Sequence, residues 1–462
     1  MYVDIFFRLA PRLRVLGDAR QPVLFNPDLP AWTRLNKTGL AVLQHCDGHT
    51  SVAELANTLS TKFRAPRAAV ERDVAVFMER VFQLGFVYQD ADAWARRMRR
   101  VNYHRQLTFE EYRDMPTQSK RLNLEITQRC NLHCVHCYAN AGPEANASLP
   151  PDVISRQLDA LTELGVDRVS LSGGEPLMHP DIWAIIDILQ DAGFLVGIAT
   201  NGILVTEQVA RKLAATSVGV QVSFDGATPT THNAVRGPRA FERSLRAIQN
   251  LRHAGILERV TLAFTPLSTN VAEIDAVVEL ALSLGVPTLR MNRLCNNGRA
   301  ADGNFRPAES AAVDFYLHLQ EFQKTYSNRI SIKGDLLESV RLKRKEAAFS
   351  NCALGEALKI DPEGYVFACA QFTDRRFALG NIHCKLLTDL LPHNRVLRRL
   401  RTIWYRRFTS RRSACTACDW RLICKGGCMA EAYAEHGTFW ASDPLCAARK
   451  ATIEAALLEA AG

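Results

Sequence analysis

The chain has 462 residues, of which 47% are hydrophobic, and 57 Lys and Arg against 48 Asp and Glu give a net charge of +9. This length corresponds to about two to four domains with sizeable cores, and 23% charged residues exclude a wholly disordered chain. Charged residues or Gln interrupt every apolar run before about 18 residues, the length that a membrane-spanning helix needs. The composition therefore predicts a soluble protein.

The 13 cysteines are distributed unevenly: one precedes residue 130, three lie within 130–137 and five within 415–446. The first residues do not have the charged start and unbroken apolar core of a secretory signal, so we expect a cytoplasmic protein. In that reducing compartment, thiols stay free or bind metal instead of pairing. The clustering therefore predicts metal ligands.

Residues 1–90 combine short β-like stretches with helical periodicity, which predicts a winged-helix-like domain. Residues 91–120 are rich in charge and poor in aliphatic residues, so we expect a solvated linker helix, with a peptide- or nucleic-acid-binding strip as the alternative. The elements expected in the first domain are strands at 12–16 and 22–26 and helices at 38–45, 51–63 and 67–84.

Residues 121–310 alternate apolar strands with amphipathic helices. Six β/α repeats predict an α/β fold with a parallel sheet, either a partial (β/α)6 TIM-type barrel or an open, doubly wound sheet. In both folds the functional groups gather at the carboxyl ends of the strands. The expected strands are 122–126, 168–171, 195–200, 219–224, 260–265 and 288–291, and the expected helices are 152–164, 181–192, 207–215, 241–254 and 272–284.

After about residue 307 the alternation is expected to stop. A helix is expected at 308–326, and most of it lies in a bridging segment, 311–345. A cysteine-rich domain at 346–450 and a C-terminal helix at 451–462 follow. Within that domain, strands at 358–360 and 365–368 flank the sequence Asp361-Pro362-Glu363-Gly364, which favours a hairpin turn.

Three thiols follow the first expected barrel strand in a CxxxCxxC pattern, at Cys130, Cys134 and Cys137. Thiolates hold iron–sulfur clusters, and a loop this short lets all three bind one cubane. Three ligands leave one iron of a 4Fe–4S cluster open to a substrate or cofactor. A zinc site completed by His133 and His136 is the alternative.

This loop resembles the signature of the radical S-adenosylmethionine (SAM) enzymes, in which an aromatic residue is usual at the position of His136. The resemblance implies that SAM chelates the open iron. One electron, supplied by an external reductant of the flavodoxin or ferredoxin type, then cleaves SAM to methionine and a 5′-deoxyadenosyl radical.

Loops after the next strands are similar to segments of this family that contact SAM. Paired glycines permit close backbone approach, and an arginine fork suits a carboxylate. The resemblance implies that a GGEP segment contacts the methionyl amine, that Ser223 and Asp225 lie near the ribose and that Arg236 lies near the carboxylate. The implied SAM-binding residues are His136, Gly173, Gly174, Glu175, Thr200, Asn201, Ser223, Asp225 and Arg236.

Seven C-terminal cysteines exceed any single zinc site and require two sites. Their order resembles the SPASM extension of peptide-modifying radical SAM enzymes, which carries two auxiliary clusters. Ten bound thiolates and three oxidised cores would lower the net charge from +9 to about +5. The resemblance implies a closed cluster on Cys415, Cys418, Cys424 and Cys446 and a second cluster, with a site open to substrate, on Cys352, Cys369 and Cys428.

Three cysteines remain outside these sets. Cys46 lies on an apolar helix face and is expected in the core, and Cys384 receives no role. Cys295 follows the sixth strand and should border the active site. It is therefore a candidate catalytic residue, as a hydrogen-atom donor or a ligand, with a passive thiol as the alternative.

Residues 1–90 also resemble the PqqD-like peptide chaperone of pyrroloquinoline quinone biosynthesis, a RiPP recognition element, at motifs such as Phe25-Asn26-Pro27 and Gly85-Phe86-Val87. The resemblance implies binding of a precursor's leader peptide as an added strand on an exposed sheet edge. The alternatives are a winged-helix domain that only packs on the barrel and one that binds nucleic acid. Acidic residues on the candidate recognition helix, such as Glu71 and Asp73, oppose the second.

Together these features predict a maturase that cross-links, epimerises or oxidises a ribosomally made peptide. One alternative is a radical SAM modifier of a small molecule, such as a tetrapyrrole side chain. Another is a non-catalytic iron–sulfur electron carrier or peptide chaperone. No nucleic acid or membrane is expected as a partner.

Overall fold

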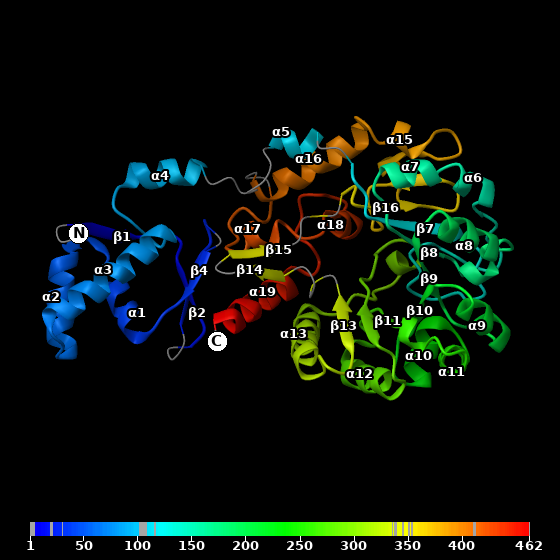
Figure 1. Ribbon diagram of the computed structural model, residues 1–462, viewed down its shortest axis with the longest axis horizontal. Coiled ribbons are helices and arrows are strands. Elements are labelled where there is room, and N and C mark those ends of the chain that lie inside the picture. The colour runs from blue at the N-terminus through cyan, green and yellow to red at the C-terminus, as the bar shows by residue number, and fades with distance from the viewer. Residues whose placement is uncertain are drawn as a thin grey trace.

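A computed structural model describes residues 5–18, 22–29, 31–100, 109–114, 117–334, 336, 340–343, 346–349, 352, 354–409 and 413–461. The N-terminal domain lies at one end of the molecule and the α/β barrel at the other (Figure 1). Within these residues no helix has the length and apolar character needed to cross a membrane.

The N-terminal domain contains two small sheets, where the sequence predicts only two or three strands. Its elements are β1 (Phe6–Leu9), β2 (Arg14–Leu16), β3 (Val23–Asn26), β4 (Ala31–Arg34), α1 (Lys37–Gln44), β5 (Asp47–Ser51), α2 (Val52–Phe63), α3 (Arg67–Gln83) and β6 (Val87–Tyr88). One sheet has the order β5-β1-β6, and in the other β3 pairs with β2 and β4. The three predicted helices are confirmed. The additional strands are two to five residues long, too short for a period of two to mark them.

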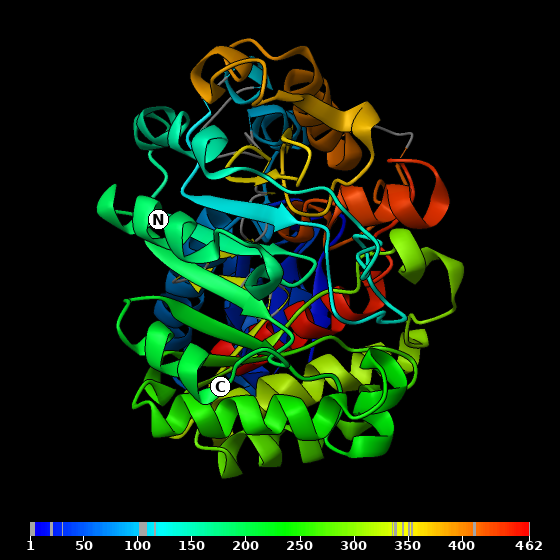
Figure 2. The same cartoon turned by 90° about the vertical axis from the view of Figure 1, so that its right-hand side faces the viewer.

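The barrel sheet contains all six predicted strands, each parallel to the next (Figure 2). They are β7 (Arg121–Thr127), β8 (Arg168–Gly173), β9 (Leu195–Thr200), β10 (Gly219–Ser223), β11 (Val260–Phe264) and β12 (Thr288–Met291). The helices between them are α6 (Pro151–Ser155), α7 (Leu158–Glu163), α8 (Ile182–Asp191), α9 (Glu207–Ala214), α10 (Pro229–Arg236), α11 (Ala240–His253) and α12 (Ile274–Ser283). Single 3₁₀ turns are η1 (Pro176–Met178), η2 (Leu257–Arg259), η3 (Val271–Glu273), η4 (Gly298–Asp302) and η5 (Arg375–Phe377).

The alternation does not stop after residue 307, contrary to the sequence prediction. Helix α13 (Glu309–Thr325) leads into β13 (Ser331–Gly334), which pairs in parallel with β12. At the other edge, β16 (Ala357–Ile360) from the cysteine-rich region pairs in parallel with β7. The sheet order, β13-β12-β11-β10-β9-β8-β7-β16-β17-β18, is open, as a partial barrel requires.

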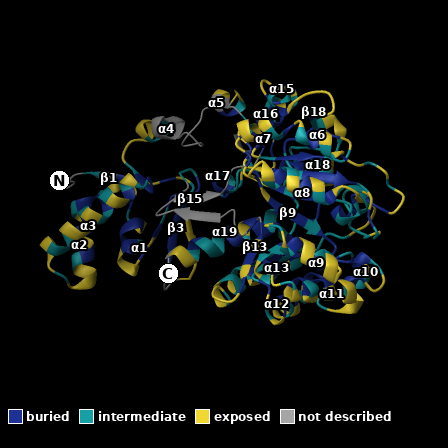
Figure 3. Cartoon of the chain, turned by 45° about the vertical axis from the view of Figure 1, so that its right-hand side comes forward, coloured by how far each residue is buried: buried dark blue, intermediate teal, exposed yellow. Residues whose placement is uncertain are grey.

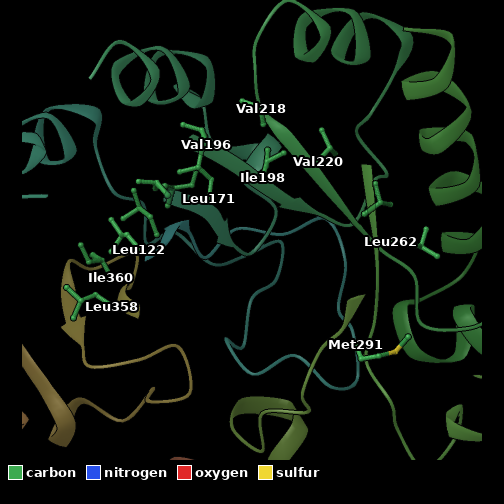
Figure 4. Close-up of a cluster of buried hydrophobic side chains, with 14 of the residues drawn as sticks. Leu122, Leu171, Val196, Ile198, Val218, Val220, Leu262, Met291, Leu358 and Ile360 are labelled. Atoms are coloured by element: carbon green, nitrogen blue, oxygen red, sulfur yellow. The ribbon is translucent and has the colours of Figure 1, made fainter. Parts of the chain in front are cut away.

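The barrel core explains why these strands form. Every second residue, including Leu122, Leu171, Ile198, Val220 and Leu262, is buried in one large cluster between the sheet and its helices (Figure 4). Because successive side chains of a strand face opposite sides, the residues between them line the concave face of the sheet. The polar strand ends therefore meet on that face.

One predicted barrel helix is broken. The segment 152–164 forms α6 and α7, separated at Arg156 and Gln157. Gln157 is buried, and its carboxamide accepts from Leu387 N at 3.0 Å and donates to Ile382 O at 3.4 Å. The break thus directs a polar side chain into the C-terminal region, because that region supplies the matching backbone groups.

The C-terminal region joins the barrel through the predicted hairpin, since β16 pairs antiparallel with β17 (Tyr365–Phe367). Its other elements are β18 (Ala378–Asn381), α15 (Leu387–Leu390), α16 (Arg395–Thr409), α17 (Arg421–Cys424), α18 (Met429–His436) and α19 (Cys446–Ala461). Helix α19 also packs along α13, where Lys324 pairs with Glu459 at 2.8 Å.

The predicted linker is only partly solvated. It contains α4 (Ala91–Arg100) and α5 (Phe109–Asp114), while residues 101–108 and 115–116 lie outside the described residues. Tyr112 of α5 is buried against Trp404 of α16, with ring centroids 4.9 Å apart, and Asp114 pairs with Arg398 at 2.7 Å. Figure 3 shows exposed residues on α5, so this part of the linker is held by Tyr112 while its outer side remains exposed.

The N-terminal domain packs directly on the C-terminal region. Phe25 of β3 stacks on Trp420, with ring centroids 4.9 Å apart, and both belong to an apolar cluster with Ile453 and Leu457 of α19. Asp419 pairs with Arg12 at 2.7 Å beside that cluster. Two further strands, β14 (Val340–Lys343) at the end of the bridging segment and β15 (Glu346–Phe349) at the start of the cysteine-rich region, extend the β2–β4 sheet on the β4 side.

Candidate functional site

The cysteine loop begins where β7 ends, at the carboxyl edge of the barrel sheet. Cys130 N donates to Gly142 O at 3.0 Å, so the loop closes on itself. Val135 N donates to Val235 O at 3.0 Å, which connects the loop to the end of α10. Cys130 is buried, whereas Cys134 and Cys137 are partly exposed. The loop therefore presents three thiols within a fixed backbone.

Arg299, which the sequence analysis does not assign, holds this loop from the opposite side. Its Nε donates to Cys134 O and its Nη2 to Ala141 O, both at 2.9 Å, and its backbone N donates to Cys137 O at 3.0 Å. The preceding Gly298 has φ +57°, and a Cβ there would lie 2.6 Å from the carbonyl oxygen of Cys137. Gly298 is thus required for close approach, and its place after the sixth strand was the available signal.

The GGEP segment after β8 packs on the residues just before Cys130. Gly174 N donates to Thr127 O at 2.6 Å, and Glu175 N donates to Arg129 O at 2.8 Å. A Cβ on Gly173 would lie 2.2 Å from Thr127 O, and one on Gly174 would lie 2.2 Å from Arg129 O. The sequence analysis attributes these glycines to close approach of a ligand. In the structure the close approach is to the backbone that carries the cysteine loop.

Glu175 connects this segment to the end of β9. Its fully buried carboxylate accepts from Thr200 Oγ1 at 2.7 Å and from Asn201 N at 2.8 Å. Asn201 Nδ2 in turn contacts Cys130 Sγ at 3.8 Å and donates to Asn131 Oδ1 at 2.8 Å. Burial raises the pKa of Glu175, although these hydrogen bonds oppose the rise. The structure therefore brings the predicted SAM-binding residues Glu175, Thr200 and Asn201 together around the first cysteine.

Asp225, at the end of β10, forms a buried ion pair with Arg236. Its Oδ2 accepts from Arg236 Nε and Nη2, each at 2.7 Å, and lies 3.3 Å from His136 Nε2. Its Oδ1 accepts from Thr265 N at 2.8 Å. Burial alone would raise the pKa of Asp225, but the charge of Arg236 holds it below its usual value. Ser223, the last residue of β10, lies beside them, partly exposed.

Two histidines of this cluster have a ring nitrogen without a partner among the described residues, His136 Nδ1 and His232 Nε2. His232 Nδ1 accepts from Asp225 N at 3.1 Å, so its proton is on Nε2. Burial lowers the pKa of both rings to about 4, which keeps both neutral at pH 7. An unpaired nitrogen on His136, between Cys134 and Cys137, is a group that a ligand can satisfy.

Cys295 follows β12 and is buried beside the cysteine loop. Asn297 Nδ2 donates to its Sγ at 3.2 Å, and burial raises its pKa to about 12. Cys295 also helps to raise the pKa of Tyr138, which directly follows Cys137. The structure therefore brings this thiol to the barrel site, in its protonated form.

The seven auxiliary cysteines fall into two groups. Burial raises the pKa of Cys424 to about 12, and the charges of Cys415 and Cys446 add to that rise. Burial also raises the pKa of Cys446, and the charges of Cys415 and Cys418 add to it. In the second group, burial is the main cause that raises the pKa of Cys352 and of Cys428, and the charge of Cys369 adds to both rises. In the structure Cys418 and Cys424 pack against the apolar cluster of Phe25 and Trp420, whereas Cys352, Cys369 and Cys428 pack against the main core cluster. The division of the seven ligands between two clusters stays a prediction.

Asp443 organises both groups, and the sequence analysis missed it. Its fully buried carboxylate accepts from Cys428 N at 2.5 Å and from Arg449 Nε at 2.8 Å, and its carbonyl accepts from Cys446 N at 2.9 Å. Burial would raise its pKa, but Arg449 and Arg293 lower it to about 2. Its position three residues before the last cysteine was the only signal.

Another buried ion pair joins the barrel to the cysteine-rich C-terminal region. Arg293, two residues before Cys295, pairs with Glu431 of α18 at 3.2 Å, and Arg306 lies 3.8 Å from the same carboxylate. Burial raises the pKa of Glu431. Since α18 begins at Met429, directly after Cys428, the contact connects the loop that carries Cys295 to the second cysteine group.

The donor sets fit iron–sulfur clusters. All ten predicted ligands are thiols, the donors that such clusters require, and the amide of Asn201 lies beside the sulfur of Cys130. Among the described residues, no three His, Cys, Asp or Glu side chains converge closely enough for one metal ion. A cluster of four irons is wider than one ion, so its thiolates need not converge in that way.

Comparison with known proteins agrees with this geometry. Residues 124–281 match the radical SAM superfamily, and residues 22–87 match coenzyme PQQ synthesis protein D. The mycofactocin maturase MftC of Mycobacterium tuberculosis is 31% identical over 336 residues, which cover 70% of this chain and 82% of that protein. The chain belongs to the radical SAM superfamily. It is thus a radical SAM enzyme, and this family uses SAM and a 4Fe–4S cluster.

Two further proteins are similar to this radical SAM enzyme. The AdoMet-dependent heme synthase of Methanosarcina barkeri is 31% identical over 340 residues, covering 70% of this chain and 94% of that protein. The crystal structure of Streptococcus suis SuiB bound to its precursor peptide SuiA has a TM-score of 0.58 and 15% identity, and covers 96% of this chain and all of that one. The fold of SuiB therefore extends over all three regions of this enzyme.

Of the two remaining cysteines, Cys46 lies where the sequence predicts, and no position was predicted for Cys384. Cys46 is in the core of the N-terminal domain, with its Sγ 3.6 Å from Val42 O and 4.0 Å from Met78 Sδ. Cys384 is exposed. Neither thiol lies in the groups described above.

Proposed function

We propose that this radical SAM enzyme modifies a ribosomally made precursor peptide. The observation that carries the proposal is the combination, in one chain, of the barrel site, two auxiliary cysteine groups and a PqqD-like domain packed on one of them. A mycofactocin maturase is among its relatives. A small-molecule enzyme has no need of a domain that matches a peptide-binding family.

In this proposal Cys130, Cys134 and Cys137 hold the 4Fe–4S cluster that binds SAM. When bound, the two cofactors supply a 5′-deoxyadenosyl radical. Glu175 fixes Thr200 and Asn201 so that they face the methionyl part of SAM, and Gly173 and Gly174 keep the GGEP backbone against the cysteine loop. His136 offers its unpaired Nδ1 to the nucleoside, next to Ser223.

Asp225 and Arg236 position one another in the proposed SAM site. Both oxygens of Asp225 already accept hydrogen bonds, and its side chain is fully buried. We therefore assign Asp225 to orienting Arg236 and His136, with the remaining donors of Arg236 directed to a carboxylate.

Cys415, Cys418, Cys424 and Cys446 are proposed to hold one auxiliary cluster, and Cys352, Cys369 and Cys428 another. The second set has three ligands, which leaves a coordination position for the substrate. Cys295, a protonated thiol next to both the barrel site and Glu431, is proposed as a hydrogen-atom donor to a substrate radical. If Cys295→Ala leaves turnover and product distribution unchanged, this role is excluded.

For leader binding we propose the part of the β4 edge that lies beyond its pairing with β15. β15 pairs with β4 at one registered position among the described residues, Glu346 with Ala31. Leu35 N donates to Pro22 O on the β3 side, so by alternation the N–H of Arg34 points to the outer edge. Proline at that position would remove one ladder donor.

The leader assignment is tested by titrating the full-length holoenzyme with labelled peptides encoded beside the gene. Arg34→Pro should weaken binding of the true precursor at least tenfold, and the matched variant Arg34→Ala should bind it like the wild type. Equal binding by both variants would move the site to another edge.

The catalytic proposal is tested by anaerobic reconstitution with SAM and dithionite. The enzyme should form 5′-deoxyadenosine, and a co-expressed precursor peptide should change in mass by two hydrogens if it is cross-linked or oxidised. Absence of 5′-deoxyadenosine would contradict SAM cleavage. Unchanged peptide mass with active SAM cleavage would leave epimerisation, which is detected by chiral amino-acid analysis.

A second candidate function is modification of a tetrapyrrole side chain. The observation that favours it is the similarity to the AdoMet-dependent heme synthase of Methanosarcina barkeri, which covers 94% of that protein. A binding test separates the two candidates. If the substrate is a tetrapyrrole, an iron porphyrin should bind the holoenzyme with a shift of its Soret band, and no peptide encoded beside the gene should bind residues 5–90.

We further propose that the protein works in the cytoplasm with a flavodoxin or ferredoxin as electron donor and without nucleic acid. All 13 cysteines are unpaired, which suits a reducing compartment. Acidic Glu71 and Asp73 on α3 oppose phosphate binding there. Dependence of SAM cleavage on a purified flavodoxin tests the donor.

A further inference from the structure

Arg407, near the end of α16, is a fully buried guanidinium without a carboxylate partner among the described side chains. Its Nη2 donates to Gly426 O at 2.7 Å and to Ala441 O at 3.1 Å, and its Nη1 donates to Phe439 O. Its Nε is buried and has no partner. Carbonyl dipoles alone therefore surround a full positive charge.

This arrangement is unusual in energetic terms. Arginine cannot lose its proton in a protein, and a buried charge costs several kcal/mol unless an opposite charge compensates it. Two other buried arginines of the region have such partners, since Arg449 pairs with Asp443 and Arg293 with Glu431. The compensating charge of Arg407 must come from another group.

A thiol close to Arg407 identifies that group. The position of a Cβ on Gly426 lies 3.3 Å from Arg407 Nε and 3.9 Å from Cys415 Sγ, so the free N–H and this thiol border the same small space. Arg407 therefore lies beside the first cysteine group.

We infer that Arg407 is the buried counter-charge of the auxiliary cluster on Cys415, Cys418, Cys424 and Cys446 and raises its reduction potential. Four thiolates on an oxidised 4Fe–4S core leave a net negative charge, and reduction makes it more negative. A fixed positive charge nearby favours the reduced form, because net charge and hydrogen bonds to the sulfurs set cluster potentials.

This inference rests on the proposed auxiliary-cluster assignment and adds a role within it. Arg407 is a positioning residue, since it acts through the cluster and not on the substrate. Its effect would make the auxiliary site a better acceptor for one electron from a substrate radical.

The test is an anaerobic redox titration of the full-length holoenzyme, followed by EPR, with iron content measured in parallel. Arg407→Gln and Arg407→Met remove the charge, and Arg407→Lys keeps it. Arg401→Gln is the matched control, because Arg401 is also buried on α16 but the carboxylates that act on it are Glu356 and Asp114. The titration needs no peptide, so its result is independent of whether the substrate has been identified.

In the neutral Arg407 variants, we expect the equilibrium constant for one-electron reduction of an auxiliary cluster to fall at least tenfold, which is 59 mV. Arg407→Lys and Arg401→Gln should stay within that margin. If a neutral variant keeps its iron and its potentials, or if Arg401→Gln shifts them equally, the inference is wrong.

Loss of iron in the variants is also decisive. If the neutral variants lose auxiliary iron while Arg407→Lys retains it, the charge is needed to hold the cluster, as inferred. If Arg407→Lys loses the same iron, the guanidinium acts through its shape or hydrogen bonds, and the inference is overturned. Failure of the peptide proposal would appear elsewhere, as unmodified peptide with normal potentials.

Discussion

The two cysteine regions of this enzyme are held by different forces. The barrel loop is fixed by its neighbours' backbone: Gly174 packs on Arg129, and Arg299 donates to carbonyl oxygens of the loop. The auxiliary cysteines come from several elements and are fixed by buried charge, with Asp443 as the central acceptor. The first site thus depends on close packing and the second on charge balance, and substitutions should affect them differently.

The largest effect is expected at the barrel loop itself. Cys130→Ala should abolish 5′-deoxyadenosine formation, because two thiolates cannot hold a cluster with an open iron in place. Auxiliary iron should remain, since its ligands are separate. Iron analysis and EPR on the reconstituted protein measure both effects. The exposed Cys384→Ala is the control and should match the wild type; SAM cleavage by Cys130→Ala would refute the ligand assignment.

Removing charge should come next in size. Asp443→Asn keeps the shape of the side chain but leaves Arg449 buried without an opposite charge, which costs about 3–5 kcal/mol. We expect a lower thermal midpoint and loss of auxiliary iron with barrel iron retained. Asp419→Asn, at a partly exposed pair with Arg12, should cost less than about 1 kcal/mol. Similar losses in the two variants would contradict a charge-based auxiliary site.

Close packing is probed by Gly174→Ala. The added methyl would lie 2.2 Å from Arg129 O, so the cysteine loop or the GGEP segment must move. A displacement near 1 Å typically costs about 100-fold in rate, and we expect that loss in SAM cleavage with auxiliary potentials unchanged. On strand β9, Gly197→Ala meets its nearest atom at 3.7 Å and should be active. A fully active Gly174→Ala would remove the packing argument.

The smallest expected effect is a pH dependence. Burial lowers the pKa of His232 from 6.5 to about 4. The folded protein favours the neutral imidazole of His232. The stability that this preference contributes is therefore fully present above pH 6.5 and is lost as the pH falls towards 4. His232→Asn keeps an acceptor for Asp225 N without titrating. Thermal midpoints between pH 7 and 5 should fall less steeply in the variant; equal slopes would exclude this source.

The sequence predicts contiguous features well. The six barrel strands are apolar runs separated by amphipathic helices, and the cysteine loop is a single motif, so each carries its signal locally. Residues that act across the fold carry only their position as a signal: Arg299 and Asp443 are an ordinary arginine and aspartate until the loops meet. The same reason hid β13 and the pairing of the predicted strand β16 with β7, because these strands gain their partners only when the sheet is assembled.

The stacking of Phe25 on Trp420 has a consequence beyond domain packing. Cys418 and Cys424 lie against the same apolar cluster, so a face of the N-terminal sheet forms part of the wall of the proposed auxiliary site. Iron–sulfur centres are damaged by molecular oxygen, and an apolar wall keeps solvent away from the metal. The N-terminal domain would then protect the auxiliary cluster from oxygen in addition to binding the peptide. A truncated enzyme that lacks this domain should lose the cluster in air.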